Sequence, residues 1–444
     1  MRKSLRIKER AYSSAFDFSF EKQRRVRVEK SFGMDCRDGI LRSAPAYKSI
    51  VRSNGKTVSC GDWDILSLGK LNYFDQGKNC IVEKYAALTY DGQLLFEKSE
   101  GVLETVATGL IDGVIFPVIG LDGVPKLIAV GKEANCVCDN TGTVTTLGVE
   151  NSVGAGCFFK HRLFLGVQGG KIVYSSPEDL TDFKQSVSNG GGISFPNVGG
   201  EIVAFRVLNG EMYVFFERGI LRLDIAGEPK AFVSERLDYT GGKIFGRTVG
   251  ACGNVIFFMA SDGAYRFDGR KIERLLAHFV EIPKAETGRE GCASWQDRAL
   301  ICYQTNGGVK TLALYNDGKD GYYLNGLAAL SAFEGEPLFV NTQKVICALN
   351  DMGGDLFDGN ILCVRTDFGI AGYKTLRRLV FDGEGSFALT LRTGKRILKR
   401  TVVLENGGAE LQIAERGRSF SVCIEPKSVL KIRSWTAEWN TVGG

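Results

Sequence analysis

Along most of the chain, short β-rich runs of mostly apolar residues are separated by polar turns that contain glycine. The turns fall near residues 91, 141, 218, 262, 307 and 358, and the last four are 44, 45 and 51 residues apart. A short apolar run bounded by turn residues predicts a strand, and a Gly-containing turn between two such runs predicts a hairpin. A repeat of about 40–50 residues with several short strands is typical of a β-propeller. Six blades of about 50 residues or seven of about 46 both fill residues 46–370, which we assign to this domain.

Strands are expected throughout that domain, and one short helix. The strand ranges are 126–130, 162–167, 171–174, 202–207, 212–216, 255–260 and 299–303. The helix is expected over 273–280, where Leu275, Leu276, Phe279 and Val280 share a face at helical spacing.

Residues 1–45 are predicted to form an N-terminal arm with one basic hairpin. Phe16, Phe18 and Phe20 alternate with polar residues, and Val26 and Val28 do so after a polar turn. Residues 2–30 contain ten Lys or Arg against four acids.

The basic turn and strand of this hairpin supply the candidate assembly or DNA-facing residues, which are Arg24, Arg25 and Arg27. The alternative is a solvated strand face without a ligand.

Residues 371–444 are predicted to be a C-terminal β-sandwich of five or six strands. Expected strands cover 376–381, 387–391, 402–404, 420–424 and 430–439. Leu430 and Ile432 share one face, whereas Trp435, Ala437 and Trp439 follow in the opposite phase. A β-bulge near Arg433 and Ser434 would reconcile the two phases.

Composition supports an all-β globular chain and limits its chemistry. There are 56 glycines but only nine prolines in 444 residues, as expected for many hairpins. No apolar stretch approaches the roughly 20 residues of a membrane span, and no apolar core follows the basic N-terminus, so we expect neither membrane insertion nor a signal peptide.

Twelve cysteines without a signal peptide predict a reducing compartment and free, mostly buried thiols. Cys136 and Cys138 should point to one face of a strand, but two histidines in the whole chain leave too few partners for a metal site.

The search for catalytic motifs gives none. There is no G-x-S-x-G, H-E-x-x-H or Walker-type phosphate loop, and His161 and His278 have no evident acid partner. Asp91, Asp262 and Asp358 precede glycine at hairpin tips, where the turn itself favours Asp. We therefore expect no enzyme, no catalytic or metal-binding residue and no cofactor. The net charge of +5 is too small to indicate a nucleic-acid binder as a whole.

One order of motifs resembles a known family. A strand and loop over 173–183 contain Ser176-Pro177-Glu178-Asp179, a strand then ends in Glu217-Arg218-Gly219-Ile220, and a third reaches Ser261-Asp262-Gly263-Ala264-Tyr265. This order resembles the virion propeller proteins of tailed bacteriophages, the nozzle or adaptor proteins of the tail. Residues 32–35 and 415–422 are similar as well.

The resemblance implies a structural component of a phage or prophage particle, located in the virion and assembled in the cytoplasm of the bacterial host. It would form a ring in the tail or neck around the DNA channel. Its partners would be copies of itself and other tail or neck proteins on the portal or adaptor side, with DNA passing without sequence-specific binding. The alternatives are a carbohydrate-binding or glycosidase-like propeller at a tail tip, and a cytosolic propeller that docks other proteins.

Overall fold

The computed structural model describes residues 10–16, 26–185, 190–225, 232–275, 280–284, 286–333, 336–350, 354–368, 372–394, 396–405 and 407–441. The chain divides into two compact units. The terminal unit comprises Met1–Lys48, Asp320–Asn325 and Leu349–Gly444, and the propeller unit comprises Ser49–Lys319 and Gly326–Ala348.

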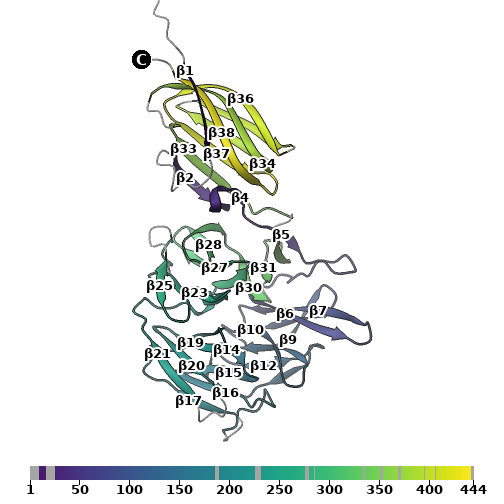
Figure 1. The fold of residues 1–444 in the computed structure, drawn as a ribbon. Coiled ribbons are helices and arrows are strands. Elements are labelled where there is room, and N and C mark those ends of the chain that lie inside the picture. Colours follow the sequence, from purple (N-terminus) through teal and green to yellow (C-terminus); the bar gives the residue numbers. More distant parts are fainter. Residues whose placement is uncertain are drawn as a thin grey trace, which may run out of the picture. The chain divides into compact units, whose positions relative to one another are not determined.

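Seven four-stranded antiparallel sheets form seven propeller blades (Figure 1). The first three blades are β6(Ile65–Asp75), β7(Cys80–Thr89), β8(Leu94–Ser99), β9(Val102–Ala107); β10(Val114–Ile119), β11(Pro125–Val130), β12(Asn135–Cys138), β13(Val144–Thr146); and β14(Ser152–Phe159), β15(Arg162–Val167), β16(Lys171–Tyr174), β17(Gly191–Ser194). The next two are β18(Ile202–Leu208), β19(Glu211–Phe216), β20(Gly219–Asp224), β21(Val233–Leu237); and β22(Gly250–Cys252), β23(Val255–Ala260), β24(Gly263–Phe267), β25(Ile272–Leu275). The last two are β26(Gly291–Trp295), β27(Arg298–Thr305), β28(Gly308–Tyr315), β29(Gly321–Asn325); and β30(Ala328–Phe333), β31(Glu336–Val340), β32(Ile346–Asn350), β5(Ala46–Ser49). The predicted all-β propeller is confirmed, and of the two expected blade numbers seven is correct.

The blades stack because alternate residues of one strand enter different cores. In β19, Met212, Val214 and Phe216 pack in one buried cluster. Tyr213 and Phe215, which lie between them in sequence, pack in the next cluster. Since successive side chains of a strand point to opposite faces, an apolar strand of this kind joins the blades on both of its sides.

The seventh blade is closed by the N-terminal side of the chain. Its strand order is β30-β31-β32-β5. The Ile50 amide donates to the Ile346 carbonyl at 2.9 Å, and the Ile346 amide donates to the Val58 carbonyl at 2.9 Å. Such pairing covers a sheet edge that would otherwise be open.

Five of the six glycine turns found in the sequence are blade hairpins. The turns near 91, 218, 262 and 307 connect the second and third strands of four blades, and the turn near 141 connects a third and a fourth strand. The turn near 358 lies between β32 and the strand β33(Ile361–Thr366), outside the blades.

The expected helix over 273–280 is wrong where the structure describes it. Ile272–Leu275 is strand β25 and pairs with β24, while 276–279 lie outside the described residues. Backbone pairing to a blade edge overrides a weak local helical pattern here. In the described ranges, the helical elements are two short 3-10 turns, Arg37–Gly39 and Gly246–Thr248.

The terminal unit contains one strongly curved ten-stranded sheet. Its strands are β1(Arg10–Phe16), β2(Val26–Phe32), β3(Met34–Asp35), β4(Leu41–Ser43), β33(Ile361–Thr366), β34(Lys374–Thr393), β35(Arg396–Leu404), β36(Gly408–Gly417), β37(Phe420–Pro426) and β38(Lys431–Thr441). The 20-residue strand β34 pairs with β36 and β38 over its first half and with β35 and β37 over its second. The predicted β-sandwich is confirmed, with β34 spanning both layers.

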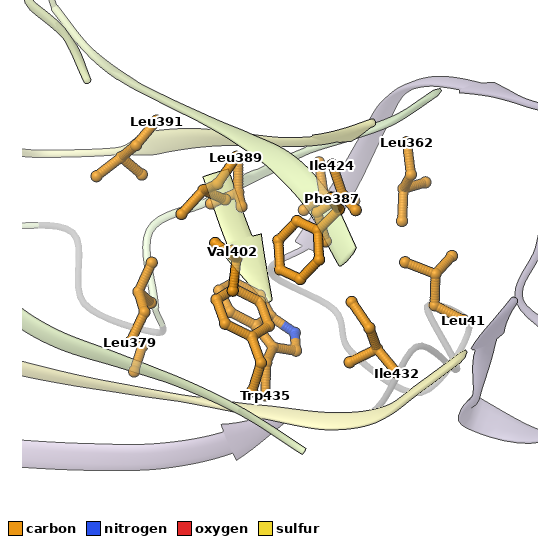
Figure 2. Close-up of a cluster of buried hydrophobic side chains, with 14 of the residues drawn as sticks. Leu41, Leu362, Leu379, Phe387, Leu389, Leu391, Val402, Ile424, Ile432 and Trp435 are labelled. Carbon is orange, nitrogen blue, oxygen red and sulfur yellow. The ribbon is translucent and has the colours of Figure 1, made fainter. Parts of the chain in front are cut away.

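The core of this unit lies between the two layers. Figure 2 shows Phe387, Leu389 and Trp435 among the side chains that fill it. The predicted bulge is confirmed: the register of β34 and β38 shifts between the pairs Asp382–Ser434 and Gly383–Ile432, which skips Arg433. Leu430 and Ile432 therefore reach the same core as Trp435, Ala437 and Trp439.

The arm is part of this sheet. β1 and β4 pair with β38, and β2 pairs with β33, so three of the four described arm strands pair with a C-terminal strand, while β3 pairs with β4. The boundary expected at residue 45 therefore does not separate the arm from the C-terminal sandwich, because the two build one unit. The predicted turn and most of the first predicted strand, 17–25, lie outside the described residues.

The expectation of free thiols needs one correction. Cys363 of β33 and Cys423 of β37 are directly opposite each other and form a disulfide, with 4.1 Å between their Cα atoms. The other ten cysteines are free, and six of them are buried. Cys136 and Cys138 both enter the core beside Leu127 and Ala129, as the alternation predicted.

We predict that Phe387→Ala destabilises the terminal unit by about 3–5 kcal/mol, because it removes a ring that is 0% exposed from a packed core. The matched control is Ile397→Ala on β35, whose side chain is 58% exposed and should change stability by less than about 0.5 kcal/mol. Chemical denaturation of both variants measures the difference, and equal losses would contradict the assigned core.

Candidate functional site: the central channel

The innermost strands of the seven blades surround one central cavity of about 1390 Å³. Its walls come from β6, β10, β14, β18, β22, β26 and β30. Strands alternate in direction within a blade, so the loops between second and third strands and the loops that connect blades lie at one end of this channel. We call that end the channel mouth. It contains the charged lining residues Asp112, Lys132, Glu201, Glu217, Lys243, Arg247, Lys284, Glu286 and Glu290.

Glycine allows neighbouring blades to approach each other at the channel wall. A Cβ atom on Gly250 would lie 2.2 Å from the Cys292 sulfur, and one on Gly291 would lie 2.6 Å from the Leu330 carbonyl oxygen. Both distances are far inside van der Waals contact, so these inner-strand positions require glycine.

Most of the mouth's charge is neutralised locally. Lys132 Nζ lies 2.6 Å from Asp112 Oδ2. Lys243 Nζ lies 3.1 Å from Glu217 Oε1 and 3.4 Å from Glu286 Oε2. These pairs link neighbouring loops of the mouth.

Two side chains connect loops of different blades across the mouth. Arg247, which precedes β22, donates to the Gly113 carbonyl at 2.7 Å, next to β10. Tyr90, which lies between β7 and β8, donates to the Gly288 carbonyl at 3.1 Å, next to β26, and Arg289 stacks over its ring at 5.5 Å. Burial lowers the pKa of Arg247 and raises that of Tyr90 to about 12, so Tyr90 stays a neutral donor.

Glu290 is the most buried carboxylate of the mouth, with 3% exposure. Its Oε1 accepts hydrogen bonds from the Thr287 amide at 2.7 Å and the Thr287 hydroxyl at 2.9 Å. Its Oε2 is buried without a hydrogen-bond partner within the described part of the chain. The neighbouring Glu286 has a raised pKa, chiefly through burial and also through repulsion by Glu290, while Lys243 acts in the opposite direction.

A further cation lies within the channel wall on β18. Arg206 donates to the Phe205 carbonyl at 2.6 Å, and burial lowers its pKa. Cys157 and Cys292 are close enough to interact with it, and burial raises the pKa of each thiol to about 12. Both sulfurs are therefore neutral thiols at pH 7, without the thiolate that nucleophilic chemistry needs.

Two carboxylates at hairpin tips bind within their own turns. Asp91 accepts from the Thr89 hydroxyl and from Gln93 Nε2 at 2.8 Å. Asp139 accepts from the amides of Thr141 and Thr143 at 2.8 and 2.9 Å. These contacts agree with the turn chemistry read from the sequence. Asp262 instead accepts from the Gly242 amide at 2.9 Å and the Tyr265 hydroxyl at 2.6 Å.

Of the described candidate residues from the sequence, neither Arg27 nor His161 is among the residues that line the channel. Arg27 is exposed on β2 of the terminal unit, and Arg24, Arg25 and His278 lie outside the described residues. His161 occupies the β14–β15 hairpin tip, with its ring 6.5 Å from that of Phe158. Across the described residues, no group of three or more His, Cys, Asp or Glu side chains could hold a metal ion.

The mouth charges were missed by the sequence analysis. Glu286, Glu290 and Arg247 lie on blade-connecting segments without a motif, and their convergence follows from the closed ring of blades. A helix long and apolar enough to cross a membrane does not occur among the residues that the structure describes.

Comparisons with known proteins bear on the fold alone. No family model matches the chain, and no curated protein matches it. Among solved structures, BamB from Moraxella catarrhalis is 10% identical, with 69% of this chain and 97% of that chain covered and a TM-score of 0.37. PorZ of Porphyromonas gingivalis is 11% identical with a TM-score of 0.41, covering 80% of this chain and 46% of PorZ. The computationally designed protein Ika8 is 10% identical with a TM-score of 0.37, covering 65% of this chain and 96% of that one.

We predict a pH effect on stability from Glu286. An acid whose pKa is raised on folding binds its proton more tightly in the folded state. Its contribution therefore favours folding below the unfolded pKa of about 4.3 and is lost as pH rises through the higher folded pKa. Glu286→Gln should therefore make the melting temperature fall less steeply between pH 4 and 7, as measured by thermal melts.

The control is Glu217→Gln, which removes the other carboxylate in contact with Lys243. If the melting temperature of Glu286→Gln depends on pH in the same way as that of the unmodified chain, Glu286 does not have the raised pKa assigned to it.

Proposed function

We propose that this chain is a non-enzymatic structural component of a phage or prophage particle, a ring-forming nozzle or adaptor protein of the tail or neck around the DNA channel. The observation that carries the proposal is the ten-stranded sheet, in which strands from both ends of the chain pair with each other and none belongs to a blade sheet. Such a sheet offers a joining surface that uses no blade strand. The order of motifs over 160–270, which resembles virion propellers of tailed phages, supports the same function.

The channel also favours a scaffold over an enzyme. The lysines Lys132 and Lys243 neutralise mouth carboxylates, and Asp91 and Asp139 are used by their turns. We propose that the partners are copies of this chain and tail or neck proteins on the portal or adaptor side, and that the protein resides in the virion after assembly in the bacterial cytoplasm.

The direct test is mass spectrometry of particles purified from the host after induction or infection. If the proposal is correct, the particles contain this chain at a fixed copy-number ratio to the portal protein. Absence from intact particles, with abundant chain in the soluble fraction, would refute it.

We predict that the purified chain is largely monomeric at micromolar concentration and forms rings with a partner or at high concentration. Charge is nearly balanced, and the described residues include no long helix to form a coiled coil. Sedimentation velocity measures this, and a tight dimer or trimer would contradict the prediction.

One observation favours a second candidate, a carbohydrate-binding or carbohydrate-cleaving propeller. Glu286, with its raised pKa, and the buried Glu290 lie near each other in the mouth, and glycosidases use a protonated acid beside a second carboxylate. Glu286 is held by Lys243, however, and Thr287 occupies one oxygen of Glu290.

We therefore predict no release of reducing sugar from bacterial wall, capsular or exopolysaccharide substrates by the pure protein. Activity that disappears in both Glu286→Gln and Glu290→Gln, but persists in Glu217→Gln, would reverse this ranking of the two functions.

A further inference from the structure

Three arginines form a row across neighbouring strands of the terminal unit. In the register of the sheet, Arg27 of β2 is opposite Arg365 of β33, Arg365 is opposite Ser421 of β37, and Ser421 is opposite Arg392 of β34. Directly opposed residues of an antiparallel sheet point to the same face. The row therefore runs across four strands on one face, which we call the basic face.

The opposite face of the same strands is the core. Val364, Val422 and Leu391 alternate with the row residues and are at most 2% exposed. Arg27, Arg365 and Arg392 are exposed, and the Arg365 side chain is 59% exposed. The arginines consequently face solvent.

A second row lies beside it on the same face, two residues away on β33, β37 and β34 and three residues away on β2, where the register shifts between Val28 and Lys30. It contains, in order across the sheet, Lys30, Cys363, Cys423, Thr390 and Lys399. Both lysines are exposed. The Cys363–Cys423 disulfide joins β33 to β37 between them, which fixes the register that aligns both rows.

Acidic side chains neutralise only part of the positive charge on the basic face. Glu29 Oε1 lies 3.8 Å from Arg365 Nη1, and Glu29 Oε2 accepts from the Ser421 hydroxyl at 2.7 Å. Arg27, Lys30, Arg392 and Lys399 have no acidic partner among the described residues. Like charges directly opposite in a sheet destabilise it, and Arg27 opposes Arg365. A face that retains this repulsion is built for an anionic partner rather than for stability.

We propose that the basic face binds the phosphate backbone of double-stranded DNA without reading its sequence. Arginine suits this partner, because its planar guanidinium forms paired hydrogen bonds with phosphate oxygens. Neighbouring strands lie about 4.8 Å apart, so the row from β2 to β34 spans about 14 Å and can contact several phosphates at once. A row of arginines on a sheet face contacts the backbone and carries no groove-entering element for base readout.

The same cations could attract an anionic membrane, but the described strands of the face carry no exposed aromatic side chain of the kind that anchors interfacial proteins. The exposed large apolar side chains on this face of the described strands are Ile397 and Val403 of the edge strand β35. The basic face would supply the contact with DNA in the proposed function, and its biological role rests on that function. DNA binding by the monomer can nevertheless be measured without any assembly.

The test is fluorescence anisotropy of the full chain with a labelled 25-base-pair duplex of arbitrary sequence over a range of salt concentrations. Micromolar binding is expected at low salt, with log K falling linearly against log salt. Arg27→Ala with Arg392→Ala should weaken binding at least tenfold and reduce the salt slope by about two, because each lost phosphate contact removes about one. Both side chains are exposed, so an unchanged thermal melt verifies folding.

The control is Arg270→Ala, an exposed arginine in a propeller turn, which should leave affinity and slope unchanged. Unchanged DNA binding in the double variant would overturn the proposal. Vesicles with anionic headgroups that bind more tightly than the duplex, with the same sensitivity to the double variant, would overturn it in favour of a membrane. If the chain is absent from particles but binds DNA through these arginines, the proposed function fails while the DNA-binding face stands.

Discussion

The fold depends on pairing the outer edge of the last blade. β5 comes from the start of the chain and β32 from residues nearly 300 positions later, yet they are neighbours in one sheet. Tyr47 and Asp355 exchange two backbone hydrogen bonds, of 3.0 and 2.9 Å, just beyond this pairing. Because the two segments run antiparallel there, the residues before β5 and those after β32 begin side by side. Closure of the ring thus brings both chain ends together, and a shared terminal sheet is its direct consequence.

Charge is distributed differently in the two units. In the propeller, lysines and arginines of the channel mouth bind nearby carboxylates or carbonyls and so link loops of the mouth. In the terminal unit, several cations of the basic face have no acidic partner among the described residues, although they share one sheet. Exposed ion pairs contribute little to stability, so this contrast bears mainly on what each surface can bind. The channel suits a rigid scaffold, and the basic face suits a charged partner.

The sequence predicted what depends on local pattern. Strands such as β15, β16 and β23 were predicted with the observed bounds, because they are short, mostly apolar runs next to glycine turns. The bulge at Arg433 followed from a phase change between Ile432 and Trp435. The blade number stayed open between six and seven, because the glycine turns found in the sequence mark five of the seven blades and none lies in the blade of β14–β17 or in the blade of β30–β32 and β5.

Features that depend on distant pairing were missed. A local pattern could not reveal that β2 pairs with β33, nor that Cys363 faces Cys423 across 60 residues. The helical spacing of Leu275 and its neighbours was misleading, since an outer blade strand offers backbone partners that an isolated segment lacks. The mouth residues Arg247, Glu286 and Glu290 meet through ring closure, which no single segment encodes. Arg27 was identified as a basic position, but its neighbours Arg365 and Arg392 became visible only through the register.

The central claim is that this chain is a ring component of a phage particle whose terminal unit faces DNA. Electron cryo-microscopy of intact particles tests it most directly. The account predicts a closed ring of this chain around the DNA path, with Arg27, Arg365 and Arg392 directed at the DNA density. A particle without such a ring, or a ring in which these three arginines face away from DNA, would contradict it.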